Sequence, residues 1–306
     1  MPNYRFRFSQ SPDDVRARTK LFGIGSAGCN IIEAAPYPSV AMSTSSADLA
    51  RSRAERKVLI GQDRLIGISD ADPDLMRKVP SIVGHELPDM FNNTEVAFIM
   101  CGLGGTSGSL GAKLLSSIAR AKGATGIVLA ATPFSAESIR RREAASKALH
   151  DLLSISSLCV EFDNDKLSAL GVNIALSRAF GLLNGIMVRP VIDLTQTLSR
   201  GDIPGFRQAV GDATYSRFGL GLGRGDDRVQ RAVQEAITSP WFDFPLANVS
   251  TAIVIYSSSD PWEREASEIL TRLEGSMPSA KILWGAYTDA TLGDGIRLSL
   301  LVCTKA

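Results

Sequence analysis

The sequence is poor in the residues that build metal centres and disulfide frameworks. Its 306 residues include only four cysteines, with no CxxC pair, and two histidines. The cysteines therefore indicate neither a zinc site nor a disulfide scaffold. His85 and His150 have no second histidine at ligand spacing, so we expect both to be structural.

An excess of one charge and a long apolar run are also missing. The 33 basic and 32 acidic residues nearly cancel, so no global charge attracts the chain to nucleic acid or anionic lipid. No apolar run approaches the ~18 residues of a membrane span, and the N-terminus lacks the apolar core of a signal peptide. We expect a cytoplasmic protein with no nucleic-acid partner and no direct membrane contact.

The apolar residues that are present indicate a layered α/β fold. They make up 44% of the chain, which is enough for a sizeable core. In the first half, short apolar runs alternate with segments of helical period. The predicted strands there are 20–24, 40–43, 57–60, 96–101, 126–131 and 157–162. Strands covered on both faces and joined by helices predict a Rossmann-like domain with a parallel sheet over residues 18–172.

The rest of the chain divides into three predicted parts. Residues 1–17 are polar and are expected to form a flexible leader. Residues 173–199 carry an apolar stripe and predict a long central helix, which Pro190 should kink or divide. Residues 200–306 predict a smaller α/β domain with strands at 250–256, 281–287 and 296–303 and helices at 226–238 and 260–273.

Two glycine-rich segments each follow a predicted strand and precede a helix. They read Gly23-Ile24-Gly25-Ser26-Ala27-Gly28-Cys29-Asn30 and Gly102-Leu103-Gly104-Gly105-Thr106-Ser107-Gly108-Ser109-Leu110-Gly111. Glycine lets backbone N–H groups approach phosphates, and a helix N-terminus adds partial positive charge. One such loop could serve packing alone, but two in one sheet predict a nucleotide site.

A dinucleotide is the weaker of the possible ligands. An NAD site needs an acid at the end of the next strand to hold the adenosine ribose. That strand ends Ser43-Thr44-Ser45-Ser46, and the nearest acid is Asp48, in the following helix. An NAD-dependent oxidoreductase therefore rests on the first glycine loop alone.

Cys29 lies in the first glycine loop at a predicted helix start, where the pKa of its thiol could fall. No histidine or second cysteine stands beside it in the sequence. We interpret it as a small loop residue and not as a nucleophile.

In their order along the chain, these segments resemble the tubulin/FtsZ superfamily, and most closely its FtsZ-like branch, over residues 19–304. Three further groups of residues carry the resemblance. The first is Pro133-Phe134-Ser135-Ala136-Glu137 with Arg141, which is similar to a ribose-binding stretch. The second is Asn164-Asp165-Lys166-Leu167, followed later in the chain by Phe180 and Asn184. The third is Gly225-Asp226-Asp227-Arg228 with Thr238-Ser239-Pro240.

The resemblance implies that GTP or GDP is bound at the end of the parallel sheet. Carried over residue by residue, it implies nucleotide contacts from Gly25, Ser26, Ala27, Gly28, Asn30, Gly104, Gly105, Thr106, Ser107, Gly108, Ser109, Glu137, Arg141, Asn164, Phe180 and Asn184. The chemistry of Phe180 and Asn184 suits this role, because an aromatic face can stack on a base and an amide one helical turn away can read its edge. The alternative for Phe180 is an ordinary core position.

Departures from the family pattern concern the phosphates. Thr106 and Leu110 stand where the family has glycine, so a side chain there restricts backbone approach or demands another dihedral angle. Asp70 and Asp72 lie in the loop expected to wrap the terminal phosphate, where they would repel a triphosphate unless a cation such as Mg²⁺ bridges them. We favour the alternative that both cap the next helix.

The loop at 200–206 also departs from the family, in which acidic residues polarise the attacking water across a subunit boundary. Here it reads Arg200-Gly201-Asp202-Ile203-Pro204-Gly205-Phe206. Asp202 matches the first acid and is the one catalytic candidate. The alternative, an N-cap just before Pro204, has equal weight.

The resemblance implies a cytoskeletal protein that assembles head to tail with itself into filaments, with residues 200–306 as its activation and polymerisation domain. Weak or altered GTP hydrolysis is expected at the subunit interface. A scaffold subunit of the same fold that does not hydrolyse GTP is the alternative. The sequence stops directly after its last predicted strand, so we expect no C-terminal tethering peptide.

Overall fold

A computed structural model describes residues 5–7, 18–66, 83–84, 86–170, 176–211 and 215–304. Its contacts group the chain into two units, one from Ala17 to Val188 and the other from Arg189 to Ala306 together with the N-terminal strand. This division falls inside the predicted central helix and not at its ends.

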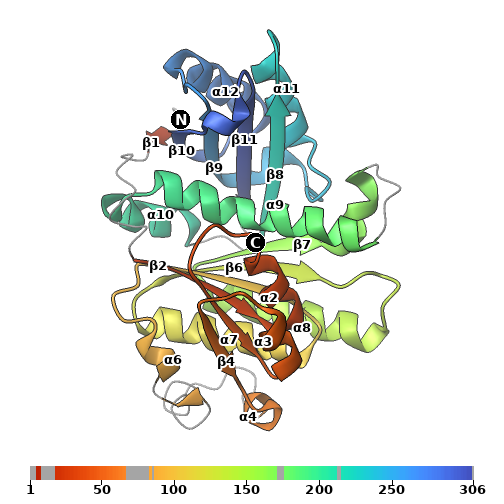
Figure 1. Cartoon of the computed structure of the whole chain (residues 1–306). Coiled ribbons are helices and arrows are strands. Elements are labelled where there is room, and N and C mark those ends of the chain that lie inside the picture. Colours follow the sequence, from red (N-terminus) through yellow and green to blue (C-terminus); the bar gives the residue numbers. More distant parts are fainter. Residues whose placement is uncertain are drawn as a thin grey trace. The chain divides into compact units, whose positions relative to one another are not determined.

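The first unit is built on a sheet of six parallel strands in the order β7-β6-β5-β2-β3-β4 (Figure 1). The strands are β2 (Thr19–Ile24), β3 (Ser39–Ser43), β4 (Arg56–Leu59), β5 (Val96–Gly102), β6 (Thr125–Thr132) and β7 (Leu158–Asp163). Each predicted strand of this half is confirmed, with small shifts at its ends. The inner strands β5 and β6 are buried on both faces, which explains their continuous apolar sequences.

Helices connect and cover these strands. They are α2 (Gly25–Ile32), α3 (Ser46–Arg51), α4 (Gln62–Ile66), α6 (Glu86–Asp89), α7 (Thr106–Ala121), α8 (Ile139–Ile155) and the 3₁₀ helix η1 (Asn164–Leu170). The apolar face of α7, with Leu114 and Ile118, and Leu152 of α8 pack with Phe22 and Ile99 in one core cluster. The helical spacing of these apolar residues is what makes such a face.

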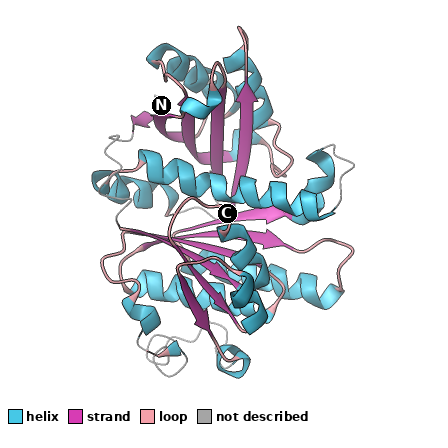
Figure 2. Ribbon diagram, viewed as in Figure 1, coloured by secondary structure: helices cyan, strands magenta, loops and turns pink. Residues whose placement is uncertain are grey.

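The second unit has a mixed sheet in the order β1-β10-β9-β11-β8. Its strands are β1 (Arg5–Arg7), β8 (Tyr215–Gly223), β9 (Val249–Ser258), β10 (Lys281–Thr288) and β11 (Ile296–Thr304). β10 is parallel to both of its neighbours, whereas β11 is antiparallel to β8 and β9. The helices are α10 (Ile203–Val210), α11 (Arg228–Ile237) and α12 (Glu263–Ser276), and α11 and α12 pack on one face of the sheet (Figure 2).

Strand β8 is a strand that the sequence did not predict. Gly219, Gly221 and Gly223 interrupt its apolar pattern. The structure explains these glycines, because a Cβ atom at Gly221 would lie 1.9 Å from the carbonyl oxygen of Ala232 in α11. A Cβ at Gly223 would meet the carbonyl of Arg228 at 1.8 Å. The alternate residues at the end of β8, Gly219, Gly221 and Gly223, therefore have to be glycine for α11 to lie directly on the strand.

Two further expectations need correction. Residues 5–7 of the expected flexible leader form β1, which pairs with β10 from Arg5↔Ile282 to Arg7↔Trp284. The predicted central helix is α9 (Leu176–Thr197). Of the two effects expected of Pro190, a kink or a division, the division is wrong, because the helix runs through this residue. A proline removes one intrahelical hydrogen bond, but the buried side chains of Val188, Val191 and Leu194 keep this helix packed on both sides of it.

Candidate nucleotide site

The chain order of the first unit's sheet reverses beside β2. β2 lies between β3 and β5, so the chain runs outward in opposite directions from the β2–β5 pair. In sheets of this kind, ligands bind outside the carboxyl ends of the strands at such a switch point. The two glycine-rich segments follow β2 and β5, and so both lie at this position.

The glycines of these segments allow unusually close backbone packing. A Cβ atom at Gly108 would lie 1.9 Å from the carbonyl oxygen of Gly102, and one at Gly28 would lie 2.2 Å from that of Met100. Gly25 has a φ of +71° and faces the second segment, since its Cβ would lie 3.1 Å from the nitrogen of Gly108. The two segments therefore form one continuous backbone surface.

The second segment opens helix α7, with Gly105 at the N-cap and Thr106 as the first helical residue. The N–H groups of the first helical turn lack intrahelical partners and are free to meet an anion. Among the described residues, Asn93 is the only one other than glycine with a positive φ, so Thr106 needs no unusual dihedral angle. Leu110 packs at the margin of the core. Both departures from the family pattern thus fit a regular helix.

Hydroxyl groups add to this surface. Ser109 is buried, and its Oγ accepts a hydrogen bond from the backbone nitrogen of Gly104 at 3.0 Å. Thr44, directly after β3, shares a 2.6 Å hydrogen bond with the Oγ of Ser107. Thr44 was not among the predicted contacts, although the run of hydroxyl residues at 43–46 was a visible signal for it.

The segment expected at the sugar is held together by its own side chains. Glu137 pairs with Arg141 at 2.9 Å, one turn apart at the start of α8, and also accepts a hydrogen bond from the backbone of Phe134. Gly104, with a φ of +89°, lies against this turn, because its Cβ would stand 2.6 Å from the carbonyl oxygen of Arg141. The phosphate segment and the sugar segment are therefore neighbours.

Phe180, which is expected at the base, contacts the segment that is expected at the sugar. The ring of Phe180 meets that of Phe134 edge to face, with centroids 5.8 Å apart. Asp165 accepts hydrogen bonds from the backbone and the hydroxyl of Ser135. Asn164 is buried, and its Oδ1 has no hydrogen-bond partner among the described residues, which is uncommon for a buried acceptor. The sequence could not reveal the Phe134–Phe180 contact, which depends on two distant segments.

The remaining predicted contacts occupy the rims of this arrangement. Ser26, Ala27 and Asn30 are exposed on α2, and Asn184 is half-buried on α9. These contacts stay predictions.

Comparison with known proteins agrees with this geometry. Residues 18–171 match the family model described as "Tubulin/FtsZ family, GTPase domain", and residues 214–305 match "FtsZ family, C-terminal domain". The chain belongs to the tubulin/FtsZ family. A guanine nucleotide is the ligand that this membership implies, and the alternative of an NAD-dependent oxidoreductase is left without support.

Relatives with this family name match along nearly the whole chain. A protein named "Cell division protein FtsZ" from Methanothermobacter thermautotrophicus is 30% identical over 95% of this chain and 80% of its own length. "Cell division protein FtsZ 1" from Thermococcus kodakarensis is 28% identical over 95% of this chain and 81% of its own.

Solved structures show the same fold. An empty FtsZ dimer from M. jannaschii has a TM-score of 0.80 at 24% identity and covers 94% of this chain and 88% of its own. CetZ1 from Haloferax volcanii, a GDP-bound monomer, has a TM-score of 0.73 at 17% identity over 93% of each chain.

Among tubulin/FtsZ site residues, Asp202 is the catalytic candidate, and its surroundings are those of a cap. Its side chain is buried, and its Oδ2 accepts hydrogen bonds from the backbone nitrogen of Ser199 at 2.8 Å and from the Ser199 hydroxyl at 2.7 Å. The first of these bonds and a reciprocal bond from the Asp202 backbone nitrogen to the Ser199 side chain form a capping box at the 3₁₀ helix η2 (Arg200–Asp202), directly before α10. Asp202 also stands at the N-cap of α10, as the sequence alternative predicted, but its side chain makes no capping hydrogen bond to that helix. A part in hydrolysis stays a prediction.

The surroundings of Cys29 agree with its interpretation as a small residue and not a nucleophile, and they do not lower the pKa of its thiol. Burial, followed by the nearby carboxylate of Asp48, raises the pKa of Cys29 to about 11. The thiol lies against the carbonyl oxygens of Gly23 and Met42. Cys29 is therefore a buried packing residue, and the other three cysteines are also buried and form no disulfide.

Other candidates have no defined place in the site. Asp70, Asp72 and His85 lie outside the described residues. Within the described ranges, no cluster of three or more histidine, cysteine or acidic residues could hold a metal ion, and none of the helices there is long and apolar enough to cross a membrane. His150 is exposed on α8.

Proposed function

We propose that this chain binds GTP or GDP at the carboxyl edge of the first unit's sheet and assembles head to tail with itself into filaments. The observation that carries the proposal is the joint packing of the two glycine segments, with Gly25 and Gly108 in close approach at the first turn of α7. Phosphates would lie on this backbone surface, close to Glu137 and Arg141.

The base would lie beside Phe180 and Asn184. Stacking on an aromatic ring contributes about 1–3 kcal/mol per base, and the half-buried amide of Asn184, one helical turn away, supplies a donor and an acceptor for its edge. Mg²⁺ is a further proposed cofactor, which the phosphates themselves would help to hold.

Hydrolysis in this proposal is slow and depends on a neighbouring subunit. The loop at 200–206 would cover the nucleotide of the next subunit, but its one matching acid is engaged with Ser199. A carboxylate held by two donors is a weak base for activating water. This engagement also supports the second candidate function, a scaffold subunit that binds nucleotide without turnover.

Three measurements test the proposal. Fluorescent GTP should bind to the purified chain, and Phe180→Ala should weaken binding by about 1–3 kcal/mol, whereas Phe244→Ala, on an aromatic pair of the second unit, should leave it unchanged. Electron microscopy should show filaments with GTP. Phosphate release per subunit should rise with protein concentration if two subunits build the active site, and its absence would select the scaffold function. Failure to bind GTP would refute both.

A further inference from the structure

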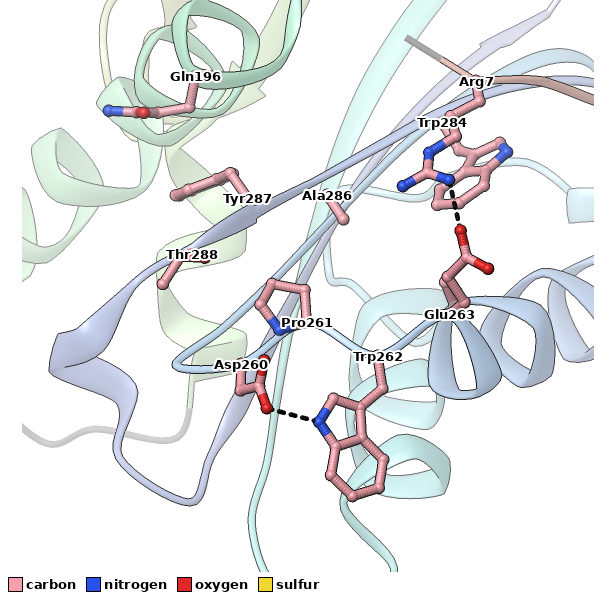
Figure 3. A pocket seen from close by; sticks show the side chains of 11 residues that line it. Arg7, Gln196, Asp260, Pro261, Trp262, Glu263, Trp284, Ala286, Tyr287 and Thr288 are labelled. Atoms are coloured by element: carbon pink, nitrogen blue, oxygen red, sulfur yellow. Dashed lines mark hydrogen bonds and ion pairs between the residues drawn. The ribbon is translucent and has the colours of Figure 1, made fainter. Parts of the chain in front are cut away.

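The second unit carries a pocket that the nucleotide site does not use. It has a volume of about 540 Å³ and lies among the end of β10, the start of α12 and the last turn of α9 (Figure 3). Gln196 lines it, in the last turn of α9. This turn comes shortly before residues 200–206 in the sequence, the loop that the proposed assembly brings to a neighbouring subunit.

One side of this pocket already holds an arginine. The guanidinium of Arg7 lies 4.9 Å from the ring centroid of Trp284 and pairs with Glu263 at 2.7 Å (Figure 3). A cation over an indole and against a carboxylate is a favourable arrangement. Arg7 thus shows that this surface of the chain can bind a guanidinium group.

A second pair of tryptophan and carboxylate lies beside the first and is open. Trp262 is 57% exposed, and its Nε1 donates to Asp260 at 2.8 Å (Figure 3). A large aromatic side chain left this exposed is characteristic of a contact surface. Its acidic neighbour favours a basic partner.

The opposite chemistry lies at the nucleotide edge of the first unit. The first turn of α8 contains Arg140, Arg141 and Arg142 and no acidic residue, although positive charge is unfavourable at a helix N-terminus. Arg141 pairs with Glu137, whereas Arg140 and Arg142 are exposed with no ion pair among the described residues. Ile139, the first residue of α8, is 64% exposed. This basic turn directly follows the segment expected at the sugar.

We propose that the pocket beside Trp262 receives the first turn of α8, residues 139–142, from a second copy of this chain. The inference rests on the proposed head-to-tail assembly and names its contact surfaces. An arginine of the neighbour lies against Trp262 and Asp260, and Ile139 covers the indole. In one subunit the pocket belongs to the same unit as the loop at 200–206. In the next subunit, residues 139–142 follow the segment expected at the sugar of the nucleotide that this loop would cover. The contact proposed here and the nucleotide contact would therefore belong to one subunit interface.

Charge reversal in the full-length protein tests the contact. Asp260→Lys, Trp262→Ala and Arg142→Glu should each raise the critical concentration for GTP-dependent pelleting about tenfold or more, with unchanged affinity for fluorescent GTP. The combined Asp260→Lys and Arg142→Glu variant should recover assembly. Asp63→Lys, an equal charge change on exposed α4, is the control and should have no effect. Normal assembly of the three single variants would overturn the contact while leaving the proposed function intact.

Cross-linking tests the contact independently of nucleotide. Because the four native cysteines are buried, a chain with Asp260→Cys and Arg142→Cys should be linked into covalent oligomers through the introduced thiols, whereas Asp63→Cys with Arg142→Cys should stay monomeric. If the protein neither binds GTP nor pellets, the proposed function fails. Covalent oligomers would then still support the contact, and their absence would refute it.

Discussion

The two units use polar groups in opposite ways. At the candidate site of the first unit, the surface is made of backbone, with glycines that bring Gly102, Gly108 and Met100 together. In the second unit, buried side chains pair with one another. Asp193 of α9 accepts hydrogen bonds from Arg189 and Tyr287. Backbone groups at such a surface remain available to hydrogen-bond a ligand. Paired side chains already neutralise one another, and they hold helices and strands together.

Two further clusters strengthen this contrast. Glu265 of α12 contacts the hydroxyl of Tyr256 and pairs with Arg228 of α11 at 2.6 Å. Burial, followed by the hydrogen bond to Glu265, raises the pKa of Tyr256 to about 12. Asp289 pairs with Arg297 at 2.7 Å. The sheet and helices of the second unit are therefore linked by charge in addition to their apolar core.

The largest expected effect is at Asp193. Burial raises the pKa of this carboxyl, although Arg189 opposes the shift. Asp193→Ala leaves Arg189, whose side chain is 12% exposed, without its partner, so unfolding free energy should fall by roughly 3–5 kcal/mol in urea titrations. Glu268→Ala, whose partner Arg272 has a side chain 42% exposed, should cost at most about 1 kcal/mol. Equal losses of unfolding free energy in the two variants would contradict the larger contribution of the buried pair.

A backbone effect of nearly that size is expected in the first unit. In Gly108→Ala the new Cβ would lie 1.9 Å from a carbonyl oxygen that belongs to β5, so stability should fall by about 3 kcal/mol. Gly105→Ala is the matched control, since nothing lies within 4 Å of the new atom, and it should cost less than about 1 kcal/mol. Similar unfolding curves for the two variants would contradict the close packing of the segments.

A smaller effect is expected from the ion pair of the first unit, which joins α7 to α8. The Lys113 side chain is 8% exposed and that of its partner Asp151 is 23% exposed. In Lys113→Met the apolar stem is kept and Asp151 can turn to water, so the loss should be about 1 kcal/mol. Asp151→Asn, which leaves a buried ammonium, should cost more. The reverse order in chemical denaturation would refute this account.

The smallest effect is a pH dependence at Asp289. Burial alone would raise the pKa of this carboxyl, but hydrogen bonds from Thr291 and Arg297 outweigh it and lower the pKa below the usual 3.8. A lowered folded-state pKa stabilises the protein above the unfolded pKa, and this stabilisation is lost as pH falls through the folded pKa. Asp289→Asn should therefore cost roughly 0.5–1 kcal/mol at pH 7 and less at pH 3. A constant difference across this range would exclude the carboxylate as the cause.

Short apolar runs identified most of the sheet, including Val96–Gly102, because a strand buried on both faces leaves a continuous apolar signature. The same rule failed at Tyr215–Gly223, where glycine is needed for the approach of α11. That requirement comes from another element and leaves no local trace.

The local order of residues also predicted which segments could meet a nucleotide, since glycine loops between strands and helices have few other uses. Only the tertiary structure determined which side chains contact one another. Phe134 meets Phe180, Thr44 meets Ser107, and the carboxylate of Asp202 turns to Ser199. Backbone conformation follows from neighbours in the chain, whereas a side chain's partner depends on which distant segments the hydrophobic core brings together.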